Sequence, residues 1–409
     1  MSCDCTASHF ATSIGGSGLP AQSVSSRWLS THPSSHMSST PQSEAPPPPS
    51  RWAELESVRG LAAMLIVVYH MPHWYPPFFA GVVQNGYLMV ELFFVLSGFV
   101  IAGAYAGRIH SVKDLFRFQF LRWARLYPVH LLFLLIYLGF EFMKLYAQSR
   151  QGMAMPNSQP FRENSWEAFF THLFLLQGIL PNGHFTAFNG PSWSISVEFY
   201  TYFVFGLLAW LAGRWRAMVF LLLSAAALAA LLSGQWLGFS PLLRCLTGFF
   251  MGCLLADAVK RLHLQVPGWA PALVFAAIVL FLIFKPEGQG DWAIFFLSAA
   301  LIYTIVKSGD SVFKRWMRAA PLVWLGTISY SVYMSHYAVE WVMNQVIRVV
   351  LKRPEVFFDG RNAPALGPFE SLAAHLVVVA VVLLVAHVTY TRVESPLREW
   401  SRKVVGRSN

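Results

Sequence analysis

The sequence predicts an all-α membrane protein, a polytopic bundle of about ten transmembrane helices. Apolar residues (AVILMFWYC) make up 55% of the chain and charged residues only 12%, whereas soluble domains are about a quarter charged. The apolar residues are also gathered into ten separate runs. Each run approaches the ~20 residues that a helix needs to cross ~30 Å of hydrocarbon.

The first 50 residues precede these runs and differ from them in composition. They are rich in serine and proline and end in a run of four prolines, Pro46 to Pro49. Such a segment cannot bury enough apolar surface to fold. We therefore expect a disordered cytoplasmic tail over residues 1–50, with Met37 as a second candidate start.

The ten apolar runs follow in order. They cover residues 60–80, 86–106, 127–147, 193–213, 217–234, 241–259, 268–285, 291–306, 321–345 and 371–391. An eleventh candidate, residues 166–182, is short and carries Glu167 and His172. If it does not cross, most lysines and arginines fall on the cytoplasmic side, as the positive-inside rule requires. We therefore expect ten crossings, with both termini cytoplasmic and residues 148–192 outside and partly re-entrant.

This topology defines a transmembrane domain over residues 51–400, followed by a short cytoplasmic tail over residues 401–409. The net charge is +10. The basic residues that produce it lie between the apolar runs and are not interleaved with exposed aromatic residues. We therefore expect a lipid bilayer as the partner and no nucleic acid. The four cysteines show no metal-binding spacing, so no metal site is expected.

Ionisable groups inside membrane spans are costly, so each is a candidate for function. His70 lies eleven residues beyond Arg59, about 16 Å along a helix that rises ~1.5 Å per residue. That distance places His70 near the middle of the membrane, where a histidine can act as a general base. A structural histidine bonded across helices is the alternative. His73 is expected to line the outer mouth of a cavity.

Two further motifs place polar residues in spans. Ser97 and Gly98, in FFVLSGF (93–99) after Glu91, allow close helix approach, and this segment either packs helices or lines a substrate path. Glu198, in SWSISVEF (192–199), could hold a cation or a sugar hydroxyl, or pair with Arg244.

A pair of arginines precedes the third span. Arg122 and Arg125 share one helix face at a spacing of three, and arginine forks suit phosphate groups. The positive-inside rule alone would also put arginines here.

A polar stripe marks the ninth span. Tyr333, His336, Tyr337 and Glu340 share one face of the helix by their spacing. Such a stripe in an apolar helix indicates either a lined cavity or a structural hydrogen-bonded network. The sequence contains no nucleophile elbow, no phosphate-cradling glycine loop and no HExxH.

Together these motifs resemble the acyltransferase 3 family of bacterial membrane proteins. The resemblance runs from about Glu54 to Arg398. It is carried by ELESVRGLAAMLIVVYH (54–70), VELFFVLSGFVI (90–101), basic residues ending in RLYP (125–128), PSWSISVEFY (191–200) and GTISYSVYMSH (326–336). Each motif is weak alone, and their order along ten spans makes the signal specific.

The resemblance implies transfer of an acyl group, commonly acetyl, to carbohydrates of the cell envelope in the bacterial inner membrane. It implies acyl-CoA as co-substrate and no permanently bound cofactor. Some members carry an additional esterase-like domain at the C-terminus, which this sequence lacks, so a stand-alone transferase or one with a separate partner is expected.

The resemblance also implies roles for individual residues. Arg59 and His70 match the family's arginine–histidine motif, and both are expected to be catalytic, with His70 as the reacting residue and Arg59 also a candidate for the donor site. Ser97 and Gly98 match its FFVLSG motif, and Arg122 and Arg125 match an arginine pair suggested to meet the phosphates of acyl-CoA. These four are expected to bind the donor.

The sequence thus favours an O-acyltransferase in which His70 deprotonates an acceptor hydroxyl that attacks the thioester. Tyr333 or His336 would stabilise the oxyanion, and Glu198 and His336 are further candidates for the acceptor side. Whether His70 is a base or is transiently acylated stays open. The competing hypotheses are a transporter, against which no inverted repeat is visible, and a membrane scaffold or sensor.

Overall fold

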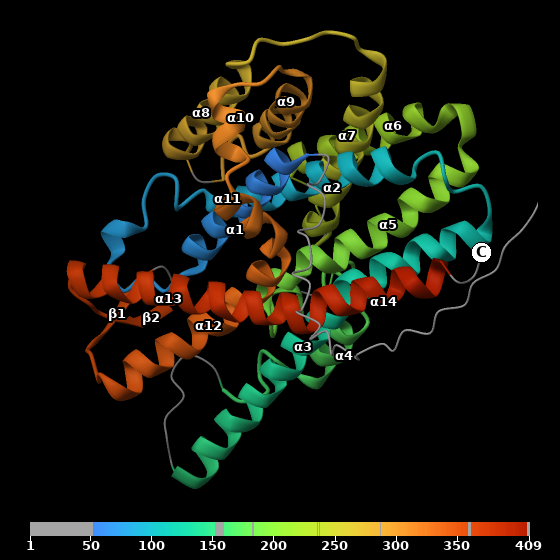
Figure 1. The fold of residues 1–409 in the computed structure, drawn as a ribbon. Helices are drawn as coiled ribbons and strands as arrows, with labels where there is room; N and C mark the ends of the chain where they lie inside the picture. The colour runs from blue at the N-terminus through green and yellow to red at the C-terminus, as the bar shows by residue number, and fades with distance from the viewer. Residues whose placement is uncertain are drawn as a thin grey trace, which may run out of the picture. The chain divides into compact units, whose positions relative to one another are not determined.

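The computed structural model describes residues 52–151, 159–181, 184–234, 236, 238–286, 288–358 and 361–406. The tail predicted over residues 1–50, with Met37, lies outside the described residues. The described chain is helical, as predicted, with one short hairpin (Figure 1).

The helices are α1 (Ala53–His70), α2 (Met89–Tyr105), α3 (Val112–Gln151), α4 (Trp166–Leu173), α5 (Trp193–Leu211), α6 (Arg216–Leu232), α7 (Ser240–Arg261), α8 (Ala270–Phe284), α9 (Ala293–Lys307), α10 (Val312–Met317), α11 (Ala320–Thr327), α12 (Ser329–Val350), α13 (Pro368–Thr389) and α14 (Ser395–Gly406). Strands β1 (Glu355–Phe358) and β2 (Arg361–Pro364) pair antiparallel between α12 and α13. Short 3₁₀ turns are η1 (Pro76–Phe78), η2 (Gly86–Leu88), η3 (His184–Thr186), η4 (Gly190–Ser192) and η5 (Gly213–Trp215), and the π-helical turn η6 (Tyr390–Glu394) joins α13 to α14.

Six helical segments in the described chain are long and apolar enough to cross a bilayer. They are Gly86–Tyr105, Val112–Arg150, Gly190–Leu211, Gly213–Leu232, Ser240–Arg261 and Pro368–Gly406. Helices α8 and α9 are apolar but shorter, and α1 and α12 carry ionisable residues along their length. The chain is a multi-pass helical membrane protein, and the count of ten crossings stays a prediction.

Helix α4 tests the prediction for residues 166–182. It has only eight residues, about 12 Å at ~1.5 Å per residue, which is too short to cross the hydrocarbon. In the structure this segment therefore does not form an eleventh span.

The predicted first span, residues 60–80, is wrong in its boundaries, because α1 ends at His70. Proline disfavours helical geometry in the residue before it. Met71 precedes Pro72 and is accordingly extended, with ψ 139°. His70 is thus the last residue of α1, at the point where the backbone leaves the helix.

The helix that contains the predicted third span, residues 127–147, is longer than that span. Helix α3 is continuous over 40 residues and contains Pro128. At ~1.5 Å per residue it is about 60 Å long, so it extends well beyond one hydrocarbon thickness. Arg122 and Arg125 therefore lie on the same helix as the span, and not on a separate loop.

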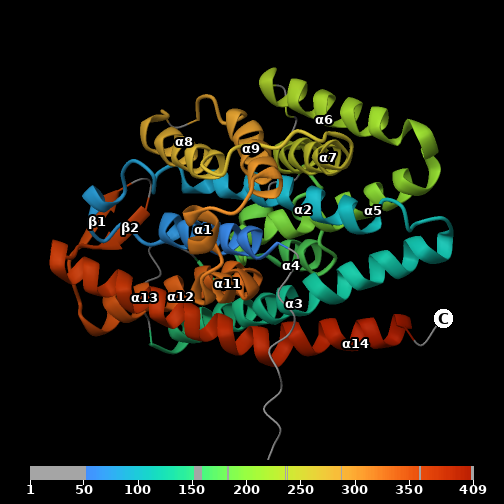
Figure 2. The same cartoon turned by 45° about the horizontal axis from the view of Figure 1, so that its top comes forward.

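Close packing around α1 and α2 fixes the centre of the fold. Helix α1 contacts α2, α9, α10, α11 and α12, and it lies among them in Figure 2. At Gly98 of α2, a Cβ atom would lie 1.9 Å from the carbonyl oxygen of Phe249 in α7. At Gly252 of α7, a Cβ atom would lie 2.0 Å from the carbonyl oxygen of Val95 in α2. Only glycine lets these two backbones approach so closely.

Helix α12 brings the site together, because it contacts α1, α3 and α13. Helix α14 runs beside α3 in both views (Figures 1 and 2). Residues 401–406 of the predicted C-terminal tail continue α14 as a helix.

Candidate active site

One cavity gathers six of the residues that the sequence singled out. Its volume is about 100 Å³. The six are Arg59 from α1, Ser97 from α2, Arg122 and Arg125 from α3, Glu198 from α5 and Tyr333 from α12. Motifs that lie far apart in the sequence thus meet at one place, which we call the arginine cavity.

The three arginines of this cavity are only partly neutralised. Arg59 pairs with Glu56 at 3.1 Å. Arg122 donates to the Tyr105 hydroxyl at 3.3 Å, and its Nε is buried without a hydrogen bond to any described residue. Arg125 makes no hydrogen bond or ion pair within the described ranges. Free guanidinium donors beside a cavity suit phosphate oxygens.

A short hydrogen-bonded chain crosses the cavity wall. The Ser97 hydroxyl lies 2.8 Å from the Tyr202 hydroxyl, which donates to Glu198 at 2.5 Å. Tyr202 was not singled out from the sequence, although it lies one helical turn from Glu198 and so on the same face. Spacing alone could have identified it.

The alternative pairing of Glu198 with Arg244 is wrong. Arg244 pairs instead with Glu91, with its Nε 2.5 Å from a carboxylate oxygen. Glu91 is 3% exposed, and this ion pair joins α2 to α7. Glu198 lines the arginine cavity together with the donor-binding candidates, and its acceptor role stays a prediction.

A pair of histidines lies beside this cavity. Nδ1 of His70 lies 3.1 Å from the carbonyl oxygen of Ile66 and 3.2 Å from Nε2 of His336. A carbonyl oxygen can only accept, so the proton of neutral His70 is on Nδ1. Nε2 of His336 is then an acceptor, and the lone pair of His70 is on Nε2. This tautomer leaves His70 Nε2 as a base.

Tyr333 connects the two features. It lines the arginine cavity, and its ring centroid lies 5.7 Å from that of His336. His70 and His336 themselves do not line the cavity. His336 therefore lies one helical turn along α12 from a residue of the cavity wall.

The hydrogen bonds of Tyr333 and His336 bear on their predicted oxyanion role. The Tyr333 hydroxyl donates to the carbonyl oxygen of Pro191 at 2.7 Å and lies 2.8 Å from the Ser194 hydroxyl. His336 turns an accepting nitrogen toward His70. Neither residue holds a free donor toward His70 in this arrangement, and the geometry of His336 fits a positioning residue better.

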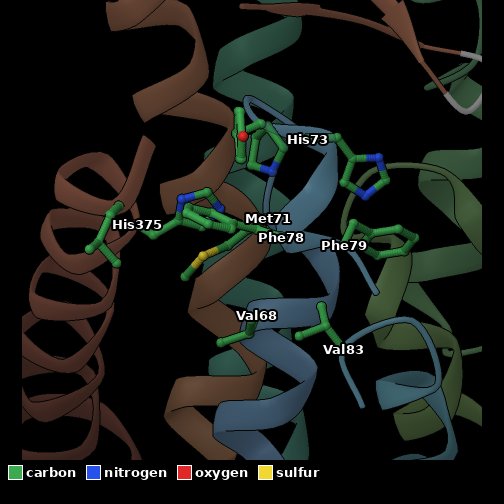
Figure 3. Close-up of a pocket in the computed structure, with 10 residues that line it drawn as sticks. Val68, Met71, His73, Phe78, Phe79, Val83 and His375 are labelled. Atoms are coloured by element: carbon green, nitrogen blue, oxygen red, sulfur yellow. The ribbon is translucent and has the colours of Figure 1, made fainter. Parts of the chain in front are cut away.

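Gly98 and His73 lie apart from the arginine cavity. Gly98 packs against the backbone of α7, as described above. His73 lines a second cavity of about 280 Å³, as its predicted place at a cavity mouth requires. In Figure 3, His73 and Phe79 lie on one side of this second cavity and His375 on the other.

The second cavity does not contain the predicted catalytic histidine, His70. It is lined mainly by apolar and aromatic side chains, and His70 is not among them. Val68, which lines it, lies on a different face of α1 from His70, and Met71, which also lines it, follows the end of that helix. Within the described residues, no three histidine, cysteine or acidic side chains gather as metal ligands would.

Comparisons with known proteins agree on the class of protein. A family model described as an acyltransferase domain matches residues 52–390. Acyltransferase MdmB of Streptomyces mycarofaciens is 28% identical over 335 residues, which cover 72% of this chain and 80% of MdmB.

For two further relatives, the aligned region covers only part of the relative's length. Peptidoglycan O-acetyltransferase OatA of Listeria monocytogenes is 24% identical over 382 residues, covering 84% of this chain and 55% of OatA. O-acetyltransferase OatA of Staphylococcus aureus is 21% identical over 383 residues, covering 84% of this chain and 57% of that protein. The chain thus spans somewhat more than half the length of these two relatives. No solved structure matches.

Proposed function

Because the chain belongs to the acyltransferase 3 family, we propose that it transfers an acyl group, most simply acetyl, from acyl-CoA to a hydroxyl group of a cell-envelope carbohydrate. Membership of an acyltransferase family makes the chain an enzyme and removes the support for a transporter or a scaffold. The acetyl group and the carbohydrate are supported by relatives named as a peptidoglycan O-acetyltransferase and an O-acetyltransferase.

The arginine cavity supports acyl-CoA as the donor. Three guanidinium groups with one ion pair among them leave positive charge for the phosphates of the donor. The cavity ends at Tyr333, one helical turn from the histidine pair. A donor whose phosphates lie on the arginines has a long pantetheine arm that can pass Tyr333 and carry the thioester to His70.

The tautomer of His70 supports its role as a general base. Nε2 takes the proton of the acceptor hydroxyl as the oxygen forms a bond to the acyl carbon. The bond from that carbon to sulfur breaks, and the proton on Nε2 passes to the departing thiolate, so that CoA leaves as a thiol. Nδ1 keeps its own proton throughout, because Ile66 and His336 both accept from it.

The proposal includes a direction across the membrane. The donor enters from the cytoplasm, the acceptor from the outer side of a bacterial inner membrane, and both termini are cytoplasmic. The distribution of basic residues between the apolar runs supports this orientation.

One observation carries the proposal: three arginines and Tyr333 line one cavity, one turn of α12 from the His70–His336 contact. The test uses membranes that contain the full chain, radiolabelled acetyl-CoA and envelope glycans extracted from the source bacterium. The natural protein is compared with His70→Ala and, as a matched control, with His73→Ala, whose histidine lines the second cavity.

We expect label in the glycan with the natural protein and with His73→Ala, and a loss of about 100-fold or more with His70→Ala. Equal labelling by His70→Ala would remove His70 from the mechanism. Labelling that depends on a donor other than acetyl-CoA would reject the proposed donor.

A further inference from the structure

A buried carboxyl group lies on the far side of the histidine pair from the arginine cavity. Glu340 is on α12, one turn beyond His336, and is only 2% exposed. Neither of its carboxyl oxygens has a hydrogen bond within the described part of the chain. No ion pair of Glu340 is present there either.

Two other elements bring unsatisfied polar groups to the same region. The hydroxyl of Tyr137, from α3, and the side-chain oxygen Oδ1 of Asn189, from the segment before η4, are both buried without a hydrogen bond in the described residues. Asn189 is held in place by its own amide nitrogen, which donates to the carbonyl oxygen of Met334 at 3.0 Å. Its Oδ1 remains available to a ligand.

Tyr337 links these groups to His70. Its ring centroid lies 5.6 Å from that of His70 and 6.5 Å from that of Tyr137. Gly190, next to Asn189, also faces the ring of Tyr337. Glu340 lies three residues beyond Tyr337 on α12, and so on the same side of that helix.

The energetic cost of leaving these buried polar groups unpaired indicates that a ligand binds to them. Buried polar groups in folded proteins are nearly always hydrogen-bonded, and an unpaired buried carboxyl group inside a membrane is especially costly. Here three such groups come from three separate elements and lie beside the proposed base. A molecule that supplies hydroxyl groups would satisfy all three.

Their position along α12 indicates which substrate that molecule is. Tyr333 lines the arginine cavity, His336 contacts His70, and Glu340 follows one turn later. The donor is proposed to reach His70 from the Tyr333 side. The acceptor must therefore approach from the other side, where Glu340 lies.

We propose that Glu340, Tyr137 and Asn189 form the binding site for the acceptor, and that this site takes a carbohydrate ring through its hydroxyl groups. The carboxyl group and the amide oxygen accept hydrogen bonds from sugar hydroxyls, and the tyrosine hydroxyl donates one. One further sugar hydroxyl is thereby held at Nε2 of His70. This inference rests on the proposed function.

The experiment measures two reactions of the purified full chain in lipid nanodiscs. One is release of radiolabelled acetate from acetyl-CoA into water without glycan, which needs the donor site and His70 only. The other is transfer of the label to increasing amounts of envelope glycan extracted from the source bacterium. The variants are Glu340→Gln and Tyr137→Phe, with Glu399→Gln on the exposed face of α14 and Tyr303→Phe as matched controls.

We expect Glu340→Gln to raise the glycan concentration for half-maximal transfer by about 10- to 100-fold, as loss of a buried hydrogen bond does. Tyr137→Phe should raise it by about three- to tenfold. Acetate release should stay within about twofold for both variants, and both controls should match the natural protein. Tyr137→Phe removes an unsatisfied buried hydroxyl, so it should fold as well as the natural chain.

The other outcomes separate this inference from the proposed function. If Glu340→Gln leaves the half-maximal glycan concentration unchanged while His70→Ala abolishes transfer, the enzyme is as proposed and the acceptor site lies elsewhere. If Glu340→Gln loses acetate release and transfer equally, Glu340 serves the donor reaction or the fold, and the inference is wrong. If the natural protein performs neither reaction, the proposed function falls and this inference with it.

Discussion

Nε2 of His336 lies 3.2 Å from Nδ1 of His70, although 266 residues separate the two along the chain. The contact joins the end of α1 to the middle of α12. It gives the Nδ1 proton of His70 a second acceptor beside the Ile66 carbonyl oxygen, which already places the basic lone pair on Nε2. The proposed base therefore depends on its partner for its orientation.

Replacing His336 tests this dependence. We expect His336→Leu to lower kcat by about 10- to 100-fold with little change in the KM for acetyl-CoA, because the arginine cavity stays intact. His336→Gln keeps an oxygen that can accept from Nδ1 and should recover part of the rate. Steady-state kinetics of both variants check this. An equal loss in the two variants, or a rise in KM alone, would contradict a positioning role.

Arg125 offers a direct test of donor binding. It lines the arginine cavity and makes no hydrogen bond or ion pair within the described chain, so its removal should cost little stability. We expect Arg125→Ala to raise the KM for acetyl-CoA by about tenfold or more, since a charge-assisted hydrogen bond to phosphate is lost. The dependence of that KM on salt concentration should also weaken.

Arg108 provides the control for Arg125. It is exposed and does not line the cavity, so Arg108→Ala removes the same charge without touching the proposed site. Equal KM values for acetyl-CoA in the two variants would argue that the arginines serve only membrane orientation, as the positive-inside rule allows.

Gly98 is expected to matter for packing and not for chemistry. A Cβ atom there would lie 1.9 Å from the Phe249 carbonyl oxygen, whereas nothing lies within 4 Å of a Cβ at Gly103 on the same helix. Gly98→Ala should therefore lower the free energy of unfolding by about 1–3 kcal/mol or more. Gly103→Ala should be neutral or slightly stabilising. Thermal unfolding in detergent checks both variants, and similar melting temperatures would show that α2 and α7 are not in tight contact.

The fold could be predicted from the sequence because the number of residues in an apolar run determines whether it can cross the membrane as a helix. The predicted span boundaries differ from the helix boundaries where local backbone effects act. Pro72 ends α1 at His70, ten residues before the predicted end of the span. Pro128, by contrast, lies inside α3 without ending it. A proline signals a local constraint, and the neighbouring helices decide whether the helix stops.

The site was predictable as a set of residues but not as an arrangement. Periodicity identified the stripe that contains Tyr333, His336 and Glu340, since residues three and four apart share a helix face. The pairing of Glu91 with Arg244 could not be read in this way, because it joins residues 153 positions apart on two helices. Such partners depend on which helices pack together, which a single sequence does not specify.

The ion pair between Glu91 and Arg244 leads to a last prediction, on stability. The pair is largely buried, with side-chain exposures of 4% and 25%, and the guanidinium carbon of Arg244 lies 4.7 Å from the Trp193 ring centroid. Glu91→Leu alone leaves the buried arginine without its counter-charge, so we expect a loss of about 3–5 kcal/mol. The double variant Glu91→Leu with Arg244→Met should recover most of it, because no charge then remains unpaired. The exposed pair of Arg353 and Glu370, with side-chain exposures of 43% and 47%, is the control, and Arg353→Leu should cost about 1 kcal/mol or less. Thermal unfolding of the variants in the same detergent measures these differences. A double variant as unstable as Glu91→Leu would mean that the two side chains act independently and that the ion pair does not couple α2 to α7.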